Sequence, residues 1–290
     1  MLIEDAEAML RAGRGSAAQL LDLAVALAGE RDRNVVASLA GSLEFVRSQL
    51  TYQSLLPYFD RWVRATFTPA AKAVGWTPRA SESDEQRELR GTLLALLGTA
   101  GDAEALRVAR RVIEDPAADA SLVEAAFYVA AVRGDAALHA RFAERFANAK
   151  SNDEYRRYLF SLASFRDRDL AQRTLAIVTG GKVRMNDYPG IFAALLSNPA
   201  TREVTWHHLK SNWSDLQTKI TSFGGRGAVQ ALGSFCTPAE RDDVRAFFAT
   251  HEAPGAERAL AQALERIDTC IALRSQHASA VASWLSLHPR

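Results

Sequence analysis

Apolar positions along this chain recur at intervals of three and four residues, which is the spacing of one helix face. The pattern is clear in residues 93–97, 122–129 and 138–146. Side chains at these intervals lie on one side of a helix and can be buried together. No stretch shows the strict alternation of apolar and polar residues that is typical of a β-strand. The chain is therefore predicted to be all-α.

Short polar breaks separate the predicted helices and contain recognisable caps. Asp102 and Asp135 each follow a glycine, and Ser16 follows Gly15, so a glycine ends one helix and a polar side chain caps the next. Thr237 with Glu240 fits a capping box. Three prolines are expected at helix starts, where the missing N–H has no cost: Pro116, Pro199 and Pro238.

The spacing of these breaks predicts helical hairpins. Helices of about 12 to 16 residues joined by turns of about 2 to 5 are typical of antiparallel helix pairs. From Glu82 onward the pairs follow at intervals of about 30 to 40 residues, as in armadillo or HEAT repeats. We expect a single domain, residues 1–290, with a longer-helix start (1–80), hairpin repeats (81–252) and C-terminal capping helices (253–290). The capping segment is compatible with two helices.

Such repeats stack into a curved superhelix with a concave inner surface, and concave helical surfaces usually bind extended chains. The charge balance argues against nucleic acid, because 35 basic and 34 acidic residues give a net charge of +1 and the basic residues are spread along the chain. No apolar run reaches the roughly 18 residues of a membrane span. The N-terminus shows no signal peptide, so a complete chain would be expected in the cytoplasm.

The two cysteines, Cys236 and Cys270, are too few for a disulfide framework or a thiolate zinc site. A single bridge between them stays open, but two buried free thiols are the favoured interpretation. Cys236 has no neighbouring base in the sequence, so a packing role is favoured over nucleophilic catalysis.

Signatures of other catalytic sites are missing from the sequence. None of the six histidines begins an H-E-x-x-H pattern, and the adjacent His207 and His208 would point about 100° apart on a helix. The segment 224–227, Gly-Gly-Arg-Gly, lacks the lysine and the preceding strand of a phosphate loop. It is interpreted as a flexible connection to a helix that begins near Ala228.

Several segments, taken in order, resemble one known family. The weaker ones are residues 3–13, 20–31, 74–76 and 89–94. The strongest are Ser197-Asn198-Pro199 with Trp206, Lys210 and Asn212-Trp213, followed by Phe235-Cys236-Thr237 and Phe247-Phe248. Together they resemble the ERAP1-like C-terminal helical domain of M1-family zinc aminopeptidases, of the aminopeptidase N and puromycin-sensitive type. The resemblance covers nearly the whole chain.

This resemblance implies a division of labour between domains. Members of the family hold zinc with an HExxH helix and bind the amino terminus of the substrate with a GAMEN-like loop, and neither pattern occurs in this chain. The chain would then be a non-catalytic domain that encloses the active-site cavity and contacts the distal part of peptide substrates. Zinc is expected in the catalytic domain of the parent enzyme, and the implied partners are that domain and the peptides.

Basic side chains of this domain hold the distal end of long peptides in some relatives. Aligned on the family, Arg47 and Arg166 fall near such positions, and the guanidinium fork suits a terminal carboxylate. Arg184 and Arg226, in predicted loops, are further candidates. The alternative is that an arginine merely caps its helix or is solvated. For each arginine considered alone, this alternative is favoured.

Two other classes of function stay open at this point. A free-standing helical-repeat scaffold would bind a protein or peptide in its groove. An enzyme with an unrecognised site is the other alternative, and metal analysis with an aminopeptidase assay would reveal it.

Overall fold

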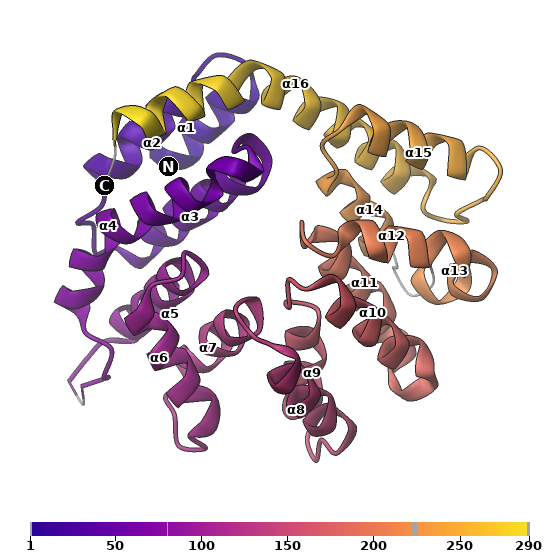
Figure 1. The fold of residues 1–290 in the computed structure, drawn as a ribbon, viewed down its shortest axis with the longest axis horizontal. Coiled ribbons are helices and arrows are strands. Elements are labelled where there is room, and N and C mark those ends of the chain that lie inside the picture. The colour runs from indigo at the N-terminus through magenta and orange to yellow at the C-terminus, as the bar shows by residue number, and fades with distance from the viewer. Residues whose placement is uncertain (1, 80, 222–225, 289–290) are drawn as a thin grey trace. The chain divides into compact units, whose positions relative to one another are not determined.

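The computed structural model describes residues 2–79, 81–221 and 226–288 (Figure 1). Within these ranges every regular element is a helix and no strand occurs, so the all-α prediction is confirmed. The chain divides into two compact units, Met1–Ala130 with Ala272–Arg290, and Ala131–Ile271. The domain boundaries expected from the sequence, at residues 80 and 252, stay predictions.

The first unit contains consecutive helices joined by short turns, and the end of the last helix joins them. Its α-helices are α1 (Leu2–Arg11), α2 (Ala17–Ala26), α3 (Arg33–Phe45), α4 (Leu56–Val74), α5 (Asp84–Thr99), α6 (Ala103–Glu114) and α7 (Ala120–Val132), the last two residues of which belong to the second unit. A π-helical turn, η1 (Val46–Leu50), and a 3-10 turn, η2 (Gln53–Leu55), connect α3 to α4.

An aromatic cluster forms part of the core of this unit. Trp62 of α4 is 1% exposed, and its ring meets those of Phe59, Phe67 and Trp284 edge-on at centroid distances of 5.5, 6.3 and 5.0 Å. The Trp284 indole N–H also donates to Asp22 of α2 at 2.7 Å. Edge-to-face aromatic pairs each add about 0.5–1.5 kcal/mol beyond area burial. The C-terminal end of the chain therefore belongs to the core of the first unit.

Glycines on α5 allow α7 to approach closely. A Cβ at Gly91 would lie 2.6 Å from the carbonyl oxygen of Ser121, and one at Gly98 would lie 2.5 Å from Val129 Cγ1. The neighbouring Arg90 is fully buried, and it donates from Nε to the Gly75 carbonyl at 2.7 Å and from Nη2 to Glu82 at 2.6 Å. The segment 89–94, one of those that carry the family resemblance, thus has a packing role.

The second unit consists of shorter helices. They are α8 (Ala136–Ala147), α9 (Asn152–Leu162), α10 (Arg168–Ile177), η3 (Val178–Lys182), η4 (Met185–Asp187), α11 (Tyr188–Ser197), α12 (Arg202–Ser211), α13 (Trp213–Thr221), α14 (Arg226–Ala231), η5 (Leu232–Ser234), α15 (Pro238–Phe248) and α16 (Glu257–Leu287) up to Ile271. The segment 253–287, which the sequence left compatible with two helices, contains a single helix because no glycine or proline interrupts residues 257–287.

The strongest motif of the resemblance packs α12 and α13 against α15. Trp206 of α12 donates its indole N–H to Asp243 of α15 at 2.7 Å, and Lys210 Nζ lies 2.6 Å from the same carboxylate. Trp213 meets Phe247 edge-on at 5.5 Å. Burial opposes the charge of Asp243, but the hydrogen bonds from Lys210 and Trp206 lower its pKa. These motif residues therefore stabilise the second unit.

The predicted N-cap residues are confirmed, although the Glu240 carboxylate of the expected Thr237 capping box accepts from the N–H of Cys236, one residue before the cap. Ser16 and Gln19 form a reciprocal capping box at the start of α2, and Asp102 and Asp135 accept from backbone N–H groups of α6 and α8. Thr237 caps α15 with Pro238 in the first turn, whereas Pro116 and Pro199 lie in turns before the next helix and not at its start. A helix start that has a polar cap within a few residues is thus predicted correctly. A proline alone does not show which residue begins the helix.

The cysteines do not remain free, which corrects the expectation of two buried thiols. Cys236, before α15, and Cys270, on α16, form a disulfide with their Cα atoms 5.2 Å apart. The two residues are 34 positions apart in the sequence, so only the packing of α16 beside the start of α15 brings the sulfurs together. Cys236 accordingly has no free thiol for catalysis.

Candidate functional site

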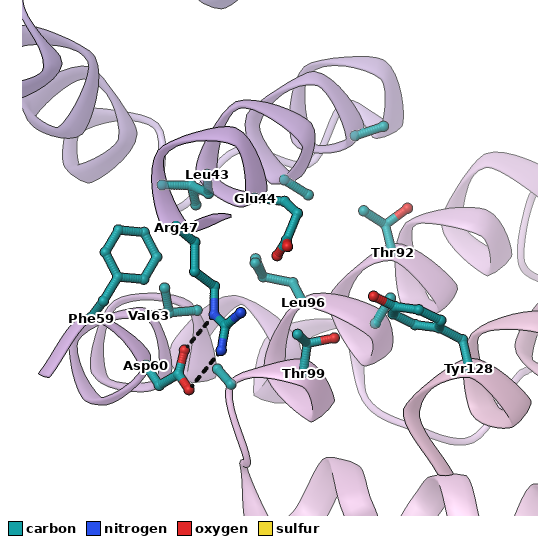
Figure 2. A pocket seen from close by; sticks show the side chains of 14 residues that line it. Leu43, Glu44, Arg47, Phe59, Asp60, Val63, Thr92, Leu96, Thr99 and Tyr128 are labelled. Carbon is teal, nitrogen blue, oxygen red and sulfur yellow. Dashed lines mark hydrogen bonds and ion pairs between the residues drawn. The ribbon is translucent and has the colours of Figure 1, made fainter. Parts of the chain in front are cut away.

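A pocket of about 290 Å³ lies among α3, η1, α4, α5 and α7 of the first unit (Figure 2). Most of its wall is apolar, and its polar side chains come from five different elements. The lining residues are Ala37, Ala40, Leu43, Glu44, Arg47, Phe59, Asp60, Val63, Thr92, Ala95, Leu96, Thr99, Ala100 and Tyr128. Concave, mostly apolar sites with a few converging polar groups are the usual form of a binding site.

The π-helical turn η1 places Arg47 in this pocket. Val46 and Leu50 of the turn are buried, which fixes the turn against the core and leaves Arg47 between α3 and α4. Its Nε donates to Asp60 Oδ1 at 2.8 Å and its Nη2 donates to Asp60 Oδ2 at 3.2 Å. Both side chains are only 11% exposed. Single π-turns of this kind are frequent at functional sites.

Two carboxylates act on the Arg47 guanidinium. Burial opposes its charge, but the hydrogen bonds to Asp60 and the fields of Asp60 and Glu44 raise the pKa of Arg47. In Figure 2 the side chains of Glu44, Arg47 and Tyr128 converge on the same space. A peptide carboxylate entering the pocket would compete with Asp60 for the guanidinium fork. Arg47 therefore lines a pocket, but its guanidinium is already paired with Asp60, and its contact with a peptide stays a prediction.

Arg166 lies in the turn between α9 and α10 of the second unit and is half-buried. The side chain of Asn198 positions this turn, because its Nδ2 donates to the carbonyls of Ala163 at 3.2 Å and Phe165 at 2.9 Å. The Asn198-Pro199 motif of the family resemblance thus holds the backbone that carries Arg166.

Arg184 lines a second pocket, of about 430 Å³, together with Lys150, Lys182, Asn152 and Tyr155. Its guanidinium lies 4.2 Å from the centre of the Tyr155 ring, and its Nη1 donates to Asn152. The Arg184 backbone N–H also donates to the Tyr155 hydroxyl at 2.9 Å. Burial raises the pKa of this phenol, so it stays protonated at neutral pH. Three cations thus share one open, polar pocket.

Arg226 is the exposed first residue of α14. Gly224 and Gly225, which precede it in the predicted flexible connection, lie outside the described residues. The structure therefore groups Arg184 with two lysines, and it leaves Arg166 and Arg226 in separate local surroundings of the same unit. Arg47 belongs to the other unit.

A comparison with protein-family models matches residues 1–269 to the ERAP1-like C-terminal domain. The chain belongs to this family. Similar curated proteins include Aminopeptidase 2, mitochondrial, of Saccharomyces cerevisiae, 24% identical over 92% of this chain and 29% of the relative. Aminopeptidase M1 of Arabidopsis thaliana is 28% identical over 92% of this chain and 32% of the relative. The Alanine/arginine aminopeptidase of Saccharomyces cerevisiae is 22% identical over 99% of this chain and 35% of the relative.

This ERAP1-like domain spans about a third of the length of the M1-family aminopeptidases that it matches. The recognition made from the sequence is confirmed. The ordered motifs made the family recognisable because they reflect helix packing. Trp206 and Lys210 both contact Asp243, and such contacts need particular side chains at particular distances along the chain.

Within the ranges that the structure describes, no group of three or more His, Cys, Asp or Glu side chains could hold a metal ion. His139 is 2% exposed, and its Nε2 lies 2.9 Å from the Thr174 hydroxyl. Burial, followed by the field of His207, lowers the pKa of His208. In the same ranges no helix is long and apolar enough to cross a membrane.

Proposed function

We propose that this chain is the non-catalytic C-terminal domain of an M1-family zinc aminopeptidase, and that it encloses the active-site cavity and contacts the distal part of peptide substrates. The family match over residues 1–269 is the observation that carries the proposal. The relatives are named as aminopeptidases, and this chain corresponds to about a third of their length. The remaining two thirds leave room for a catalytic domain.

Catalysis itself would reside in that other part of the enzyme. Zinc hydrolases use about three protein ligands and one open position for water, with a general base nearby. The sequence lacks an HExxH helix and a GAMEN-like loop, so removal of the N-terminal residue is assigned to the upstream domains. A domain that closes over such a site excludes water and completes the enclosure of the substrate.

The pocket around Arg47 is the peptide contact that we favour in the first unit. It is concave, largely apolar and has charged groups at its wall, as a side-chain subsite requires. In the second unit Arg166 and the pocket of Arg184, Lys150 and Lys182 are the corresponding candidates. Arg226, at the exposed start of α14, is a further one.

Filling the first pocket tests the proposal in the aminopeptidase that carries this domain. Ala95 lines the pocket from α5 and is half-buried, so Ala95→Phe should occupy its volume. We expect about a tenfold loss of kcat/KM for long peptides, the scale of a subsite contact, with little change for dipeptide substrates. The matched control is Ala65→Phe, because Ala65 is exposed on α4 and does not line this pocket.

A second variant tests the other unit in the same assay. Arg166→Ala should weaken long peptides more than dipeptides, and Arg168→Ala, an exposed arginine two residues further along, is its control. Equal losses on short and long substrates for both Ala95→Phe and Arg166→Ala would contradict a role in binding the distal part of the peptide.

A further inference from the structure

The pocket that Arg184 lines in the second unit concentrates positive charge. Its lining residues include Lys150, Lys182 and Arg184, and none of the described residues that line it is an aspartate or a glutamate. Three cations and no carboxylate give these lining residues a formal charge of +3, whereas the whole chain carries +1. Lys150 comes from the turn before α9 and the other two cations from the segment after α10, so the fold gathers this charge.

Carboxylates near these cations in the sequence have other partners. Glu154 accepts from the backbone N–H of Lys150 at 2.9 Å, and Asp187 of η4 forms an ion pair with Arg156. Among the described residues, no carboxylate forms an ion pair with any of the three basic side chains of the pocket. Their mutual repulsion is therefore not offset by a side chain of the pocket wall.

Fixed contacts hold the two segments that carry the cations. The Arg184 backbone N–H donates to the Tyr155 hydroxyl at 2.9 Å and the Arg184 guanidinium lies over the Tyr155 ring, so the segment after α10 is tied to α9. Val178 at the start of η3 and Val183 just after it are buried, which anchors the turn that ends in Lys182. A site whose groups are already in place loses less free energy to ordering when a ligand binds.

The N-terminus of α9 lies at the same wall. Ser151 and Asn152, which cap and begin this helix, line the pocket. The Ser151 hydroxyl accepts from the Glu154 backbone N–H at 3.1 Å, whereas Asp153 and Glu154 of the first turn do not line the pocket. The first N–H groups of a helix have no partner within the helix, and the helix dipole makes this end positive. An anion in the pocket would therefore meet a helix N-terminus as well as three cations.

We propose that this pocket binds an oligophosphate, with Lys150, Lys182 and Arg184 as its cationic contacts. Lysine, arginine and a helix N-terminus are groups that bind phosphate in proteins. A single carboxylate, such as the end of a peptide, would offset one of the three positive charges, whereas an oligophosphate brings several negative charges into the space of about 430 Å³. This volume lies within the range of small-ligand sites. The oligophosphate site goes beyond the proposed function, in which the same pocket is a candidate contact for peptide.

The experiment is a calorimetric titration of the purified chain with pyrophosphate at low ionic strength. We expect one binding site per chain, and an affinity that falls as salt is added because exposed charges are screened. Sulfate, a single tetrahedral anion, should bind about tenfold more weakly, because it lacks the contacts of a second phosphate group. A peptide with an acetylated amino terminus and a free carboxylate is titrated in the same way and represents the other occupant.

Variants assign the binding to this pocket. Lys150→Gln and Lys182→Gln each remove one charge, and each should weaken pyrophosphate binding about tenfold, the scale of one lost charge-assisted contact. Both lysines are exposed, so the substitutions leave the packed core unchanged. Arg145→Gln is the matched control, because Arg145 is an exposed cation of α8 that does not line the pocket. It should change the affinity by less than about twofold, since water and salt screen its charge.

The outcomes separate the oligophosphate site from the proposed function. Pyrophosphate binding that both lysine variants weaken and Arg145→Gln leaves unchanged supports the site. Absence of binding to the wild-type chain, or equal weakening by all three variants, overturns it and leaves the proposed function untouched. If the peptide carboxylate binds with the same dependence on Lys150 and Lys182 while pyrophosphate does not bind, the oligophosphate assignment is wrong and the peptide contact of the proposed function is supported.

Discussion

The Cys236–Cys270 disulfide should make a large contribution to the stability of the second unit. The variant to compare is the double substitution Cys236→Ala, Cys270→Ala, which removes the bridge and leaves no free thiol. Both cysteines are buried, at 5% and 3% exposure, so alanine disturbs the surface little. The bridge joins the start of α15 to α16, and without it the unfolded chain regains the conformational freedom of the closed loop.

The loop length determines the expected magnitude. For a sequence separation of 34 residues, the chain-entropy relation gives about 3.8 kcal/mol at 25 °C. This is a large fraction of the roughly 5–15 kcal/mol that holds a typical domain folded. The double variant should therefore unfold at a clearly lower urea concentration.

The assay is urea unfolding followed by tryptophan fluorescence and far-ultraviolet circular dichroism, with and without a reductant. Trp206 and Trp213 lie beside α15 and report on the second unit. Reductant should lower the midpoint of the wild-type chain to that of the double variant and should not move the midpoint of the variant itself. A wild-type midpoint that does not respond to full reduction would refute the reasoning.

Three further perturbations have defined outcomes. Gly91→Ala should cost about 1–3 kcal/mol in the free energy of unfolding, because the new Cβ meets the Ser121 carbonyl oxygen at 2.6 Å; an unchanged urea midpoint would contradict the close helix contact. The lowered pKa of Asp243 gives stability that is present above its unfolded value of about 3.8 and is lost as the pH falls through the folded value, so Asp243→Asn should make the acid limb of the stability curve shallower. Burial, followed by the field of Arg173, lowers the pKa of His139, so the unfolded chain binds its proton more readily and stability falls as the pH drops below about 6.5. His139→Gln should flatten that decline, which urea titrations from pH 7 to pH 5 measure, and an identical slope would exclude His139 as its source.

Local sequence patterns predicted the helix caps because each cap acts within a few residues. Ser16, Asp102 and Asp135 need only the N–H groups that follow them, and all three form the expected hydrogen bonds. The all-α class followed in the same way from apolar spacing. The ordered motifs identified the family because they specify helix packing, as the hydrogen bond from Trp206 to Asp243 shows.

The chemistry of the pocket could not be predicted in the same manner. Arg47 was found as a candidate from the family resemblance. Its partner Asp60 lies 13 residues away across a π-turn and a 3-10 turn, and helical periodicity cannot predict which side chains face each other across such turns. Glu44 is one helical turn before Arg47, and this spacing was the available signal that a carboxylate would act on it. Tyr128 comes from α7, and only the approach of α5 and α7 at Gly91 and Gly98 brings it to the pocket.

The disulfide was missed for a related reason. Two cysteines give no spacing pattern, and their pairing depends on where α16 lies relative to α15. Long-range contacts of this kind are visible only once the helices are placed.

The central claim, that this domain supports peptide binding and that the chemistry lies elsewhere in the enzyme, is tested most directly by hydrolysis of an aminoacyl 4-nitroanilide by the purified chain in the presence of zinc. The account predicts no turnover above the rate in buffer, because zinc-dependent hydrolysis needs a metal held by about three protein ligands and the sequence lacks the HExxH pattern that supplies them in this family. Turnover that rises in proportion to chain concentration, with one zinc ion bound per chain, would contradict it.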